Sequence, residues 1–83
     1  RVLVADDHAV VRAGIVALLD EHDDIDVVGQ AADGLAAVEE ARRLRPDLVV
    51  MDVRMPGATG DEATARIRAE LPGTRVLILT TYE

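Results

Sequence analysis

Residues Leu48–Gly57 read LVVMDVRMPG, and this stretch decides how the chain is interpreted. Four apolar residues run directly into Asp52, and a Pro-Gly pair then turns the chain. A short apolar run bounded by turn signals is typical of a strand buried on both faces. An ionised carboxylate next to a core is costly unless something pairs with it. Asp52 therefore indicates either that the strand register is misread or that a site lies at the end of this strand.

The remainder of the chain alternates between strand and helix patterns. Strands are predicted at 1–5, 25–31, 48–51 and 75–80, and helices at 9–22, in 33–47 up to Pro46, and at 61–71. In the first helix the apolar stripe consists of Val11, Ile15, Leu18 and Leu19. Such alternation calls for parallel strands joined by helical crossovers, and the continuous apolar runs suit a sheet covered on both faces. We predict an α/β fold with a doubly wound parallel sheet, in one small domain.

Composition narrows the classes of function. Apolar residues make up 49% of the 83 residues, so an aliphatic core is available although Phe and Trp are absent. The net charge of -7, with arginine as the only base, argues against this segment itself binding nucleic acid or an anionic membrane. The absence of cysteine excludes disulfides and thiolate metal sites. No apolar run is long enough to cross a bilayer and the first residues carry no signal-peptide pattern, so we expect a cytoplasmic protein.

Polar residues follow three of the predicted strands. Asp6 and Asp7 come after the first, Asp52 ends the third, and Thr80 and Thr81 end the fourth. In open α/β sheets, ligands bind beyond the carboxyl ends of the strands. If the first and third strands are neighbours, about 4.8 Å apart, three carboxylates converge there. Oxygen ligands alone favour a hard ion such as Mg²⁺, and a carboxylate beside that ion can attack phosphorus to give an acyl phosphate.

Each of these features also has a purely structural interpretation. Asp6 or Asp7 can cap the following helix, and Asp52 can be a satisfied residue at a strand end. The two threonines can be ordinary strand formers, and His8 a partly exposed loop histidine. The combination of an acid pair, a lone strand-end acid and a strand-end hydroxyl, each after its own strand, favours a site.

Three motifs resemble the receiver domains of two-component response regulators: VLVADDH at 2–8, DLVVMDVRMPGATG at 47–60 and VLILTTYE at 76–83. The similarity covers the whole chain in order. The DDHAVVRAGIVALL opening is most similar to the subfamily whose receivers precede a LuxR-type helix-turn-helix. The resemblance implies a flavodoxin-like three-layer sandwich with strand order 2-1-3-4.

The resemblance also implies roles for individual residues. Asp52 would be phosphorylated by a sensor histidine kinase. Asp7, Asp52 and the backbone carbonyl of Arg54 would bind Mg²⁺, and Asp6 would assist that ion through water. The phosphorylated domain would regulate DNA binding through an output domain that is not in this chain.

At the end of the fourth predicted strand, the resemblance implies that the Thr80 hydroxyl turns toward the phosphoryl group and that Thr81 lines the site. A typical receiver continues through another helix, a fifth strand and a fifth helix, which carry the family's strand-end lysine. The single domain at 1–83 is therefore expected to be truncated after its fourth strand. We expect either that the real chain is longer or that two chains pair at this edge as a homodimer.

The expected phosphoacceptor is not an enzyme beyond self-catalysed phosphoryl transfer and autodephosphorylation. Two other functions compete with this interpretation. One is an aspartate-nucleophile phosphatase of the haloacid dehalogenase type. Such enzymes need a second acid two residues after the nucleophile, and here Asp52 is followed by Val53 and Arg54. The other is a stand-alone or phosphorylation-independent interaction module, which usually lacks one of the three acids.

Overall fold

Seven elements alternate between strand and helix in the computed structural model, which describes residues 1–52 and 60–79. They are β1 (Val2–Ala5), α1 (Ala9–Asp20), β2 (Val27–Ala31), α2 (Gly34–Leu44), β3 (Leu48–Asp52), α3 (Gly60–Glu70) and β4 (Arg75–Leu79). All the strands and helices expected from the sequence are present, with bounds shifted by a few residues.

One parallel sheet contains the four strands in the order β2-β1-β3-β4. Strand β1 pairs with β3 from Val2 beside Leu48 to Ala5 beside Met51. The predicted doubly wound sheet and its 2-1-3-4 order are confirmed. Because β1 and β3 are neighbours in register, the residues that follow them meet at the same end of the sheet.

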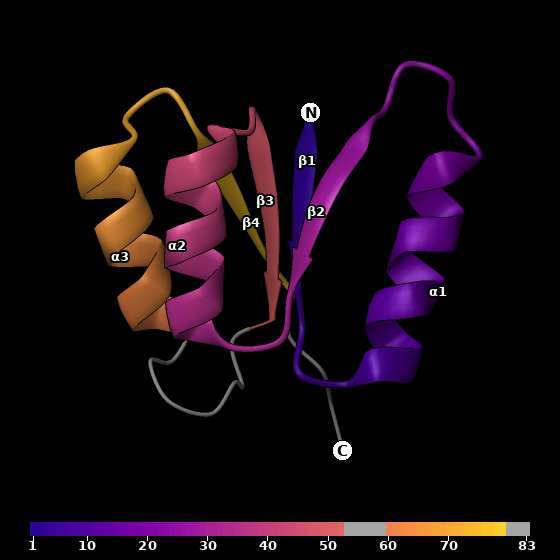
Figure 1. The fold of residues 1–83 in the computed structure, drawn as a ribbon, viewed down its shortest axis with the longest axis horizontal. Helices are drawn as coiled ribbons and strands as arrows, with labels where there is room; N and C mark the ends of the chain where they lie inside the picture. Colours follow the sequence, from indigo (N-terminus) through magenta and orange to yellow (C-terminus); the bar gives the residue numbers. More distant parts are fainter. Residues whose placement is uncertain (53–59, 80–83) are drawn as a thin grey trace.

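Helices cover both faces of the sheet, α2 and α3 on one side and α1 on the other (Figure 1). Side chains alternate along each strand, so Leu3 and Val49 face α2 and α3 while Val4 and Val50 face α1. The larger core cluster lies on the side of α2 and α3 and consists of Leu3, Ala5, Ala31, Ala37, Val38, Ala41, Val49, Met51, Ala63, Ile67 and Leu71.

Helix α1 packs less tightly than the other two helices. None of its residues is buried, and Val10 and Leu18 are 86% and 62% exposed. Ile15, Val16 and Leu19 are its contacts with a small cluster formed by Val2, Val4 and Val50. No described helix has the length and apolar character needed to cross a membrane.

The C-terminal ends of α1 and α2 are explained by residues that lie next to them. Helix α2 ends before Arg45, which takes a left-handed conformation with φ 47°. Proline disfavours the helical region for the residue before it, so Pro46 accounts for this stop, as predicted. Helix α1 ends at Asp20 rather than at His22, because His22 instead takes part in a turn in which its N–H bonds the Leu19 carbonyl and its carbonyl bonds the Ile25 N–H.

Candidate functional site

The ends of β1 and β3 place two buried carboxylates side by side. Asp52 is the last residue of β3, and Asp6 directly follows β1, one step beyond the paired residues Ala5 and Met51. The Asp6 N–H donates to the Ala31 carbonyl at 3.0 Å, so the alignment of the sheet continues through Asp6. Both aspartates are only 2% exposed. The strand register is thus as predicted, and Asp52 lies where the sequence places a site.

Asp7 and His8 complete the loop between β1 and α1. One carboxylate oxygen of Asp6, Oδ1, accepts a hydrogen bond from the backbone N–H of His8 at 2.8 Å and lies 3.3 Å from Nδ1 of the His8 ring. His8 is the N-cap residue of α1, and its side chain forms no capping hydrogen bond with the described residues. The interpretation of Asp6 or Asp7 as the helix cap is therefore wrong, because the helix begins one residue later than a cap at Asp7 requires and two residues later than a cap at Asp6 requires.

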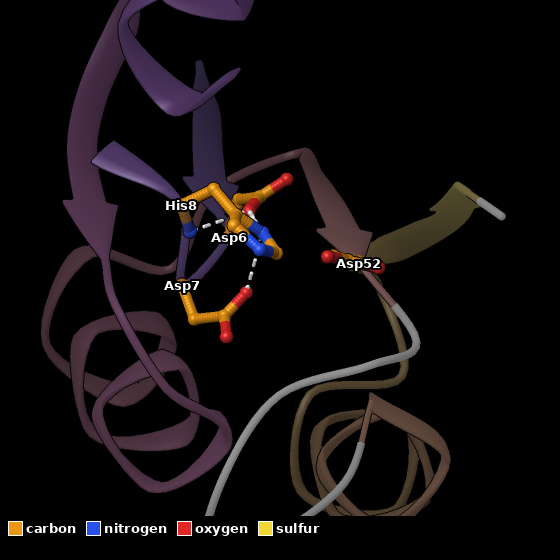
Figure 2. Close-up of side chains that lie close together, drawn as sticks. All are labelled: Asp6, Asp7, His8 and Asp52. Carbon is orange, nitrogen blue, oxygen red and sulfur yellow. Dashed lines mark hydrogen bonds and ion pairs between the residues drawn. The ribbon is translucent and has the colours of Figure 1, made fainter. Parts of the chain in front are cut away.

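These residues form one compact cluster, shown in Figure 2 with Asp52 facing the loop from the end of β3. One ligand atom from each of Asp6, Asp7, His8 and Asp52 lies within 4.8 Å of the others. Two oxygens on opposite sides of a Mg²⁺ ion lie about 4.2 Å apart, since each bond is about 2.1 Å. The cluster fits a divalent cation in both its spacing and its carboxylate donors.

The Oδ1 oxygen of Asp7 is the atom of the cluster that most favours a bound cation. Its Oδ1 is shielded from solvent and accepts no hydrogen bond from any described residue, although the Asp7 side chain as a whole is 28% exposed. Nδ1 of His8 lies 2.9 Å from this oxygen, as an ion-pair contact without hydrogen-bond alignment. A buried acceptor without a donor is costly in a folded protein, and a cation removes that cost.

Arg12 is a contributor to this region that the sequence analysis missed. From the first turns of α1 its guanidinium donates to the backbone carbonyl of Asp6 at 2.7 Å and to the side-chain oxygen of Gln30 in β2 at 3.1 Å. This one side chain joins α1, β2 and the end of β1. The available signal was a lone basic residue one turn after the acid pair.

Three of the predicted site residues lie outside the described residues. They are Arg54, whose carbonyl was expected to bind Mg²⁺, and the two threonines Thr80 and Thr81. Their roles stay predictions, as does the role of each described aspartate in the reaction.

Comparison with known proteins identifies the family. The profile of the response regulator receiver domain matches residues 2–83. The chain belongs to the response regulator receiver family. It is a receiver domain of a two-component system. Its acid cluster lies at the carboxyl ends of the strands, where ligands bind in folds of this type.

Related proteins agree with this assignment. The receiver is 45% identical over 82 residues to the response regulator protein VraR of Staphylococcus saprophyticus, covering 99% of this chain and 39% of that protein. It is 47% identical to the response regulator GacA of Pseudomonas viridiflava, covering all of this chain and 39% of GacA. The crystal structure of a LuxR-family two-component response regulator from Aurantimonas superposes with a TM-score of 0.93 at 40% identity, covering 100% of this chain and 59% of that one.

The receiver thus spans 39% of the length of these two curated relatives. Regulators of the LuxR type are among its homologues, and the described residues include no output domain. The flavodoxin-like arrangement implied by the sequence resemblance is confirmed by this structural neighbour and by the order of the strands.

Proposed function

We propose that Asp52 is the phosphoacceptor of this receiver and that a sensor histidine kinase is the donor. The observation that carries the proposal is the burial of Asp52 at the end of β3, with its carboxylate in one cluster with Asp6, Asp7 and His8. In the whole protein, the phosphorylated receiver controls a LuxR-type DNA-binding output domain. The LuxR-family homologues support this part of the proposal.

The reaction needs little from the protein beyond positioning and charge. One carboxylate oxygen of Asp52 attacks the phosphorus of a phosphohistidine, the P–N bond breaks, and the histidine leaves as the acyl phosphate forms. Asp7, Asp52 and the carbonyl of Arg54 would hold Mg²⁺, with Asp6 assisting through water. When bound, Mg²⁺ supplies positive charge that offsets the phosphoryl oxygens. The Thr80 hydroxyl would then contact the phosphoryl group, with Thr81 beside it.

The receiver accepts a phosphoryl group and loses it again, and does not turn over an external substrate as an enzyme does. The sequence after Asp52 supports this, because Arg54 occupies the place where phosphatases with an aspartate nucleophile carry their second acid. All three acids expected of a phosphorylated receiver are present in the chain, which disfavours the phosphorylation-independent module. The proposed location is the cytoplasm, where the kinase domain and the DNA are found.

The test is phosphorylation of the full-length protein by acetyl phosphate with Mg²⁺, followed by intact-mass spectrometry. Asp52→Asn should abolish the uptake of one phosphoryl group, because the amide is not a nucleophile at phosphorus. Asp47→Asn is the matched control, since Asp47 directly precedes β3 and its carboxylate is exposed. Equal uptake by Asp52→Asn and the parent protein would overturn the assignment.

A further inference from the structure

His8 brings a nitrogen donor into a cluster that is otherwise made of carboxylates. The imidazole is 65% exposed as a side chain, yet its Nδ1 atom lies inside the cluster, 2.9 Å from Oδ1 of Asp7 and 3.3 Å from Oδ1 of Asp6. Figure 2 shows the ring beside both acids, with Asp52 across from it. His8 is thus a partly exposed loop histidine, as the sequence suggested, and its ring in addition contacts both acids.

The contact of Nδ1 with Asp6 also meets hydrogen-bond criteria when the ring is protonated at Nδ1. With Nδ1 unprotonated, the same separations match those of ligands that share an ion. Two donors on adjacent positions of an octahedral ion, with bonds of about 2.1 Å, lie about 3.0 Å apart. On a tetrahedral ion the same separation is about 3.4 Å. The contact of Nδ1 with the Asp7 oxygen also lacks hydrogen-bond alignment, and that oxygen accepts no hydrogen bond from the described part of the chain. The shielded oxygen of Asp7 and the ring nitrogen beside it together form the geometry that points to a bound cation.

We infer that His8 is a metal ligand that extends this site from Mg²⁺ to first-row transition ions such as Ni²⁺ and Zn²⁺. The inference rests on the metal site of the proposed function and deepens it. In the tautomer protonated at Nε2, the Nδ1 lone pair of His8 faces the ion beside the carboxylates of Asp6, Asp7 and Asp52. Imidazole suits Ni²⁺ and Zn²⁺, whereas Mg²⁺ takes oxygen ligands. Removal of the nitrogen should therefore change the selectivity among cations more than it changes the affinity for Mg²⁺.

The sharpest variant is His8→Asn. Asparagine is among the best N-cap residues, so helix α1 should keep or gain stability at its first turn. Its side-chain oxygen replaces the nitrogen with a hard donor. The matched control is His22→Asn, which removes the other histidine of the chain, in the turn between α1 and β2. Both variants are made in the tag-free full-length protein and titrated calorimetrically with Ni²⁺ and, separately, with Mg²⁺ at one slightly alkaline pH.

We expect His8→Asn to lower the Ni²⁺ affinity at least about tenfold, since even the loss of an outer-shell partner of a metal costs about 10–100-fold. The Mg²⁺ affinity should change by less than about threefold, because Mg²⁺ does not depend on nitrogen ligands. His22→Asn should leave both affinities unchanged. A second readout is the ¹⁵N resonance of Nδ1 in His8 upon addition of diamagnetic Zn²⁺, which should shift as coordination replaces the free lone pair.

Equal Ni²⁺ affinities of His8→Asn and the parent protein, or an unmoved Nδ1 resonance, would overturn the inference. Phosphorylation of Asp52 with Mg²⁺ is measured on the same samples to separate this result from the proposed function. Normal phosphorylation together with an unchanged Ni²⁺ affinity refutes the role of His8 alone. A His8-dependent Ni²⁺ affinity in a protein that takes up no phosphate supports the ligand role and refutes the phosphoacceptor assignment.

Discussion

The two faces of the sheet differ in how many buried apolar residues cover them. On the side of α2 and α3, eleven buried residues form one cluster, whereas on the side of α1 only three described residues do so. Asp52 follows Val50 at the alternate position of β3, so the phosphoacceptor proposed here belongs to the face of α1. Most of the buried apolar contact therefore comes from the face covered by α2 and α3. The proposed phosphoacceptor lies at the end of β3 on the face covered by α1. Regions with few buried apolar contacts open more easily, which suits the proposed phosphoacceptor because its phosphoryl donor has to reach it.

The same substitution on both faces tests this comparison with the largest expected effect. Ile67 of α3 is 1% exposed inside the large cluster, and Ile67→Ala should destabilise the domain by about 2–5 kcal/mol, from lost burial plus the cavity that remains. Ile15 of α1 is only partly buried, so Ile15→Ala should cost clearly less. Urea unfolding of both variants measures the difference. Equal losses would mean that the two faces stabilise the domain alike.

Apolar patterns of this kind explain why so much of the fold could be predicted. Alternation of strand and helix gave the parallel sheet, and Pro46 gave the end of α2. The periodicity could not tell which apolar residues of α1 are covered. Ile15 and Leu19 pack against the sheet, but Val11 and Leu18 of the same predicted stripe are 43% and 62% exposed. Periodicity marks a helix face, whereas burial depends on what other elements cover that face.

The candidate site was predictable only in part, for a similar reason. Strand ends in a parallel sheet brought Asp6 and Asp52 together as expected, because topology alone determines that meeting. The contacts of His8 and Arg12 depend on the path of the loop before α1, which no periodic pattern encodes. That path also decides that neither aspartate caps the helix.

Arg12→Met tests how much the hydrogen bonds of Arg12 contribute to holding α1 against the end of β1. The substitution keeps much of the aliphatic length but removes the charged donor to the carbonyl of buried Asp6, which should cost about 1–2 kcal/mol. Arg43→Met is the control, since exposed Arg43 pairs only with Glu40 of its own helix among the described contacts, and such pairs contribute about 0.5 kcal/mol or less. Unfolding by urea again gives the values. A loss no greater than that of the control would show that α1 is held by apolar contact alone.

Leu18→Ala should have a still smaller effect in the chain of residues 1–83. The side chain is 62% exposed, so its truncation should change the free energy of unfolding by no more than about 0.5 kcal/mol. The same substitution in a longer protein sharpens the comparison of the faces. A loss of about 2 kcal/mol or more there would show that additional residues cover α1, because only a buried leucine loses that much. A large loss in the 83-residue chain itself would contradict the exposure of Leu18.

The smallest expected effect is the pH dependence of the ion pair that joins the two helices of the well-packed face. Arg42 of α2 binds Glu70 of α3 through two hydrogen bonds of 2.7 and 2.8 Å. The hydrogen bond from Arg42, followed by its charge, lowers the pKa of the Glu70 carboxyl below the ordinary 4.5. A carboxyl group with a lower pKa in the folded state stabilises the fold above its unfolded pKa and loses this contribution as the pH falls through the folded value. Both side chains are about half exposed, so solvent screens the pair and the effect should be slight.

Glu70→Gln should therefore destabilise the domain slightly near neutral pH and not at all at a pH below the folded pKa of Glu70, where the parent protein has lost the same charge. Urea unfolding of the parent and the variant at both pH values checks this, and added salt should shrink the difference at neutral pH. A difference that persisted in acid would mean that Glu70 acts through packing between α2 and α3 rather than through its charge.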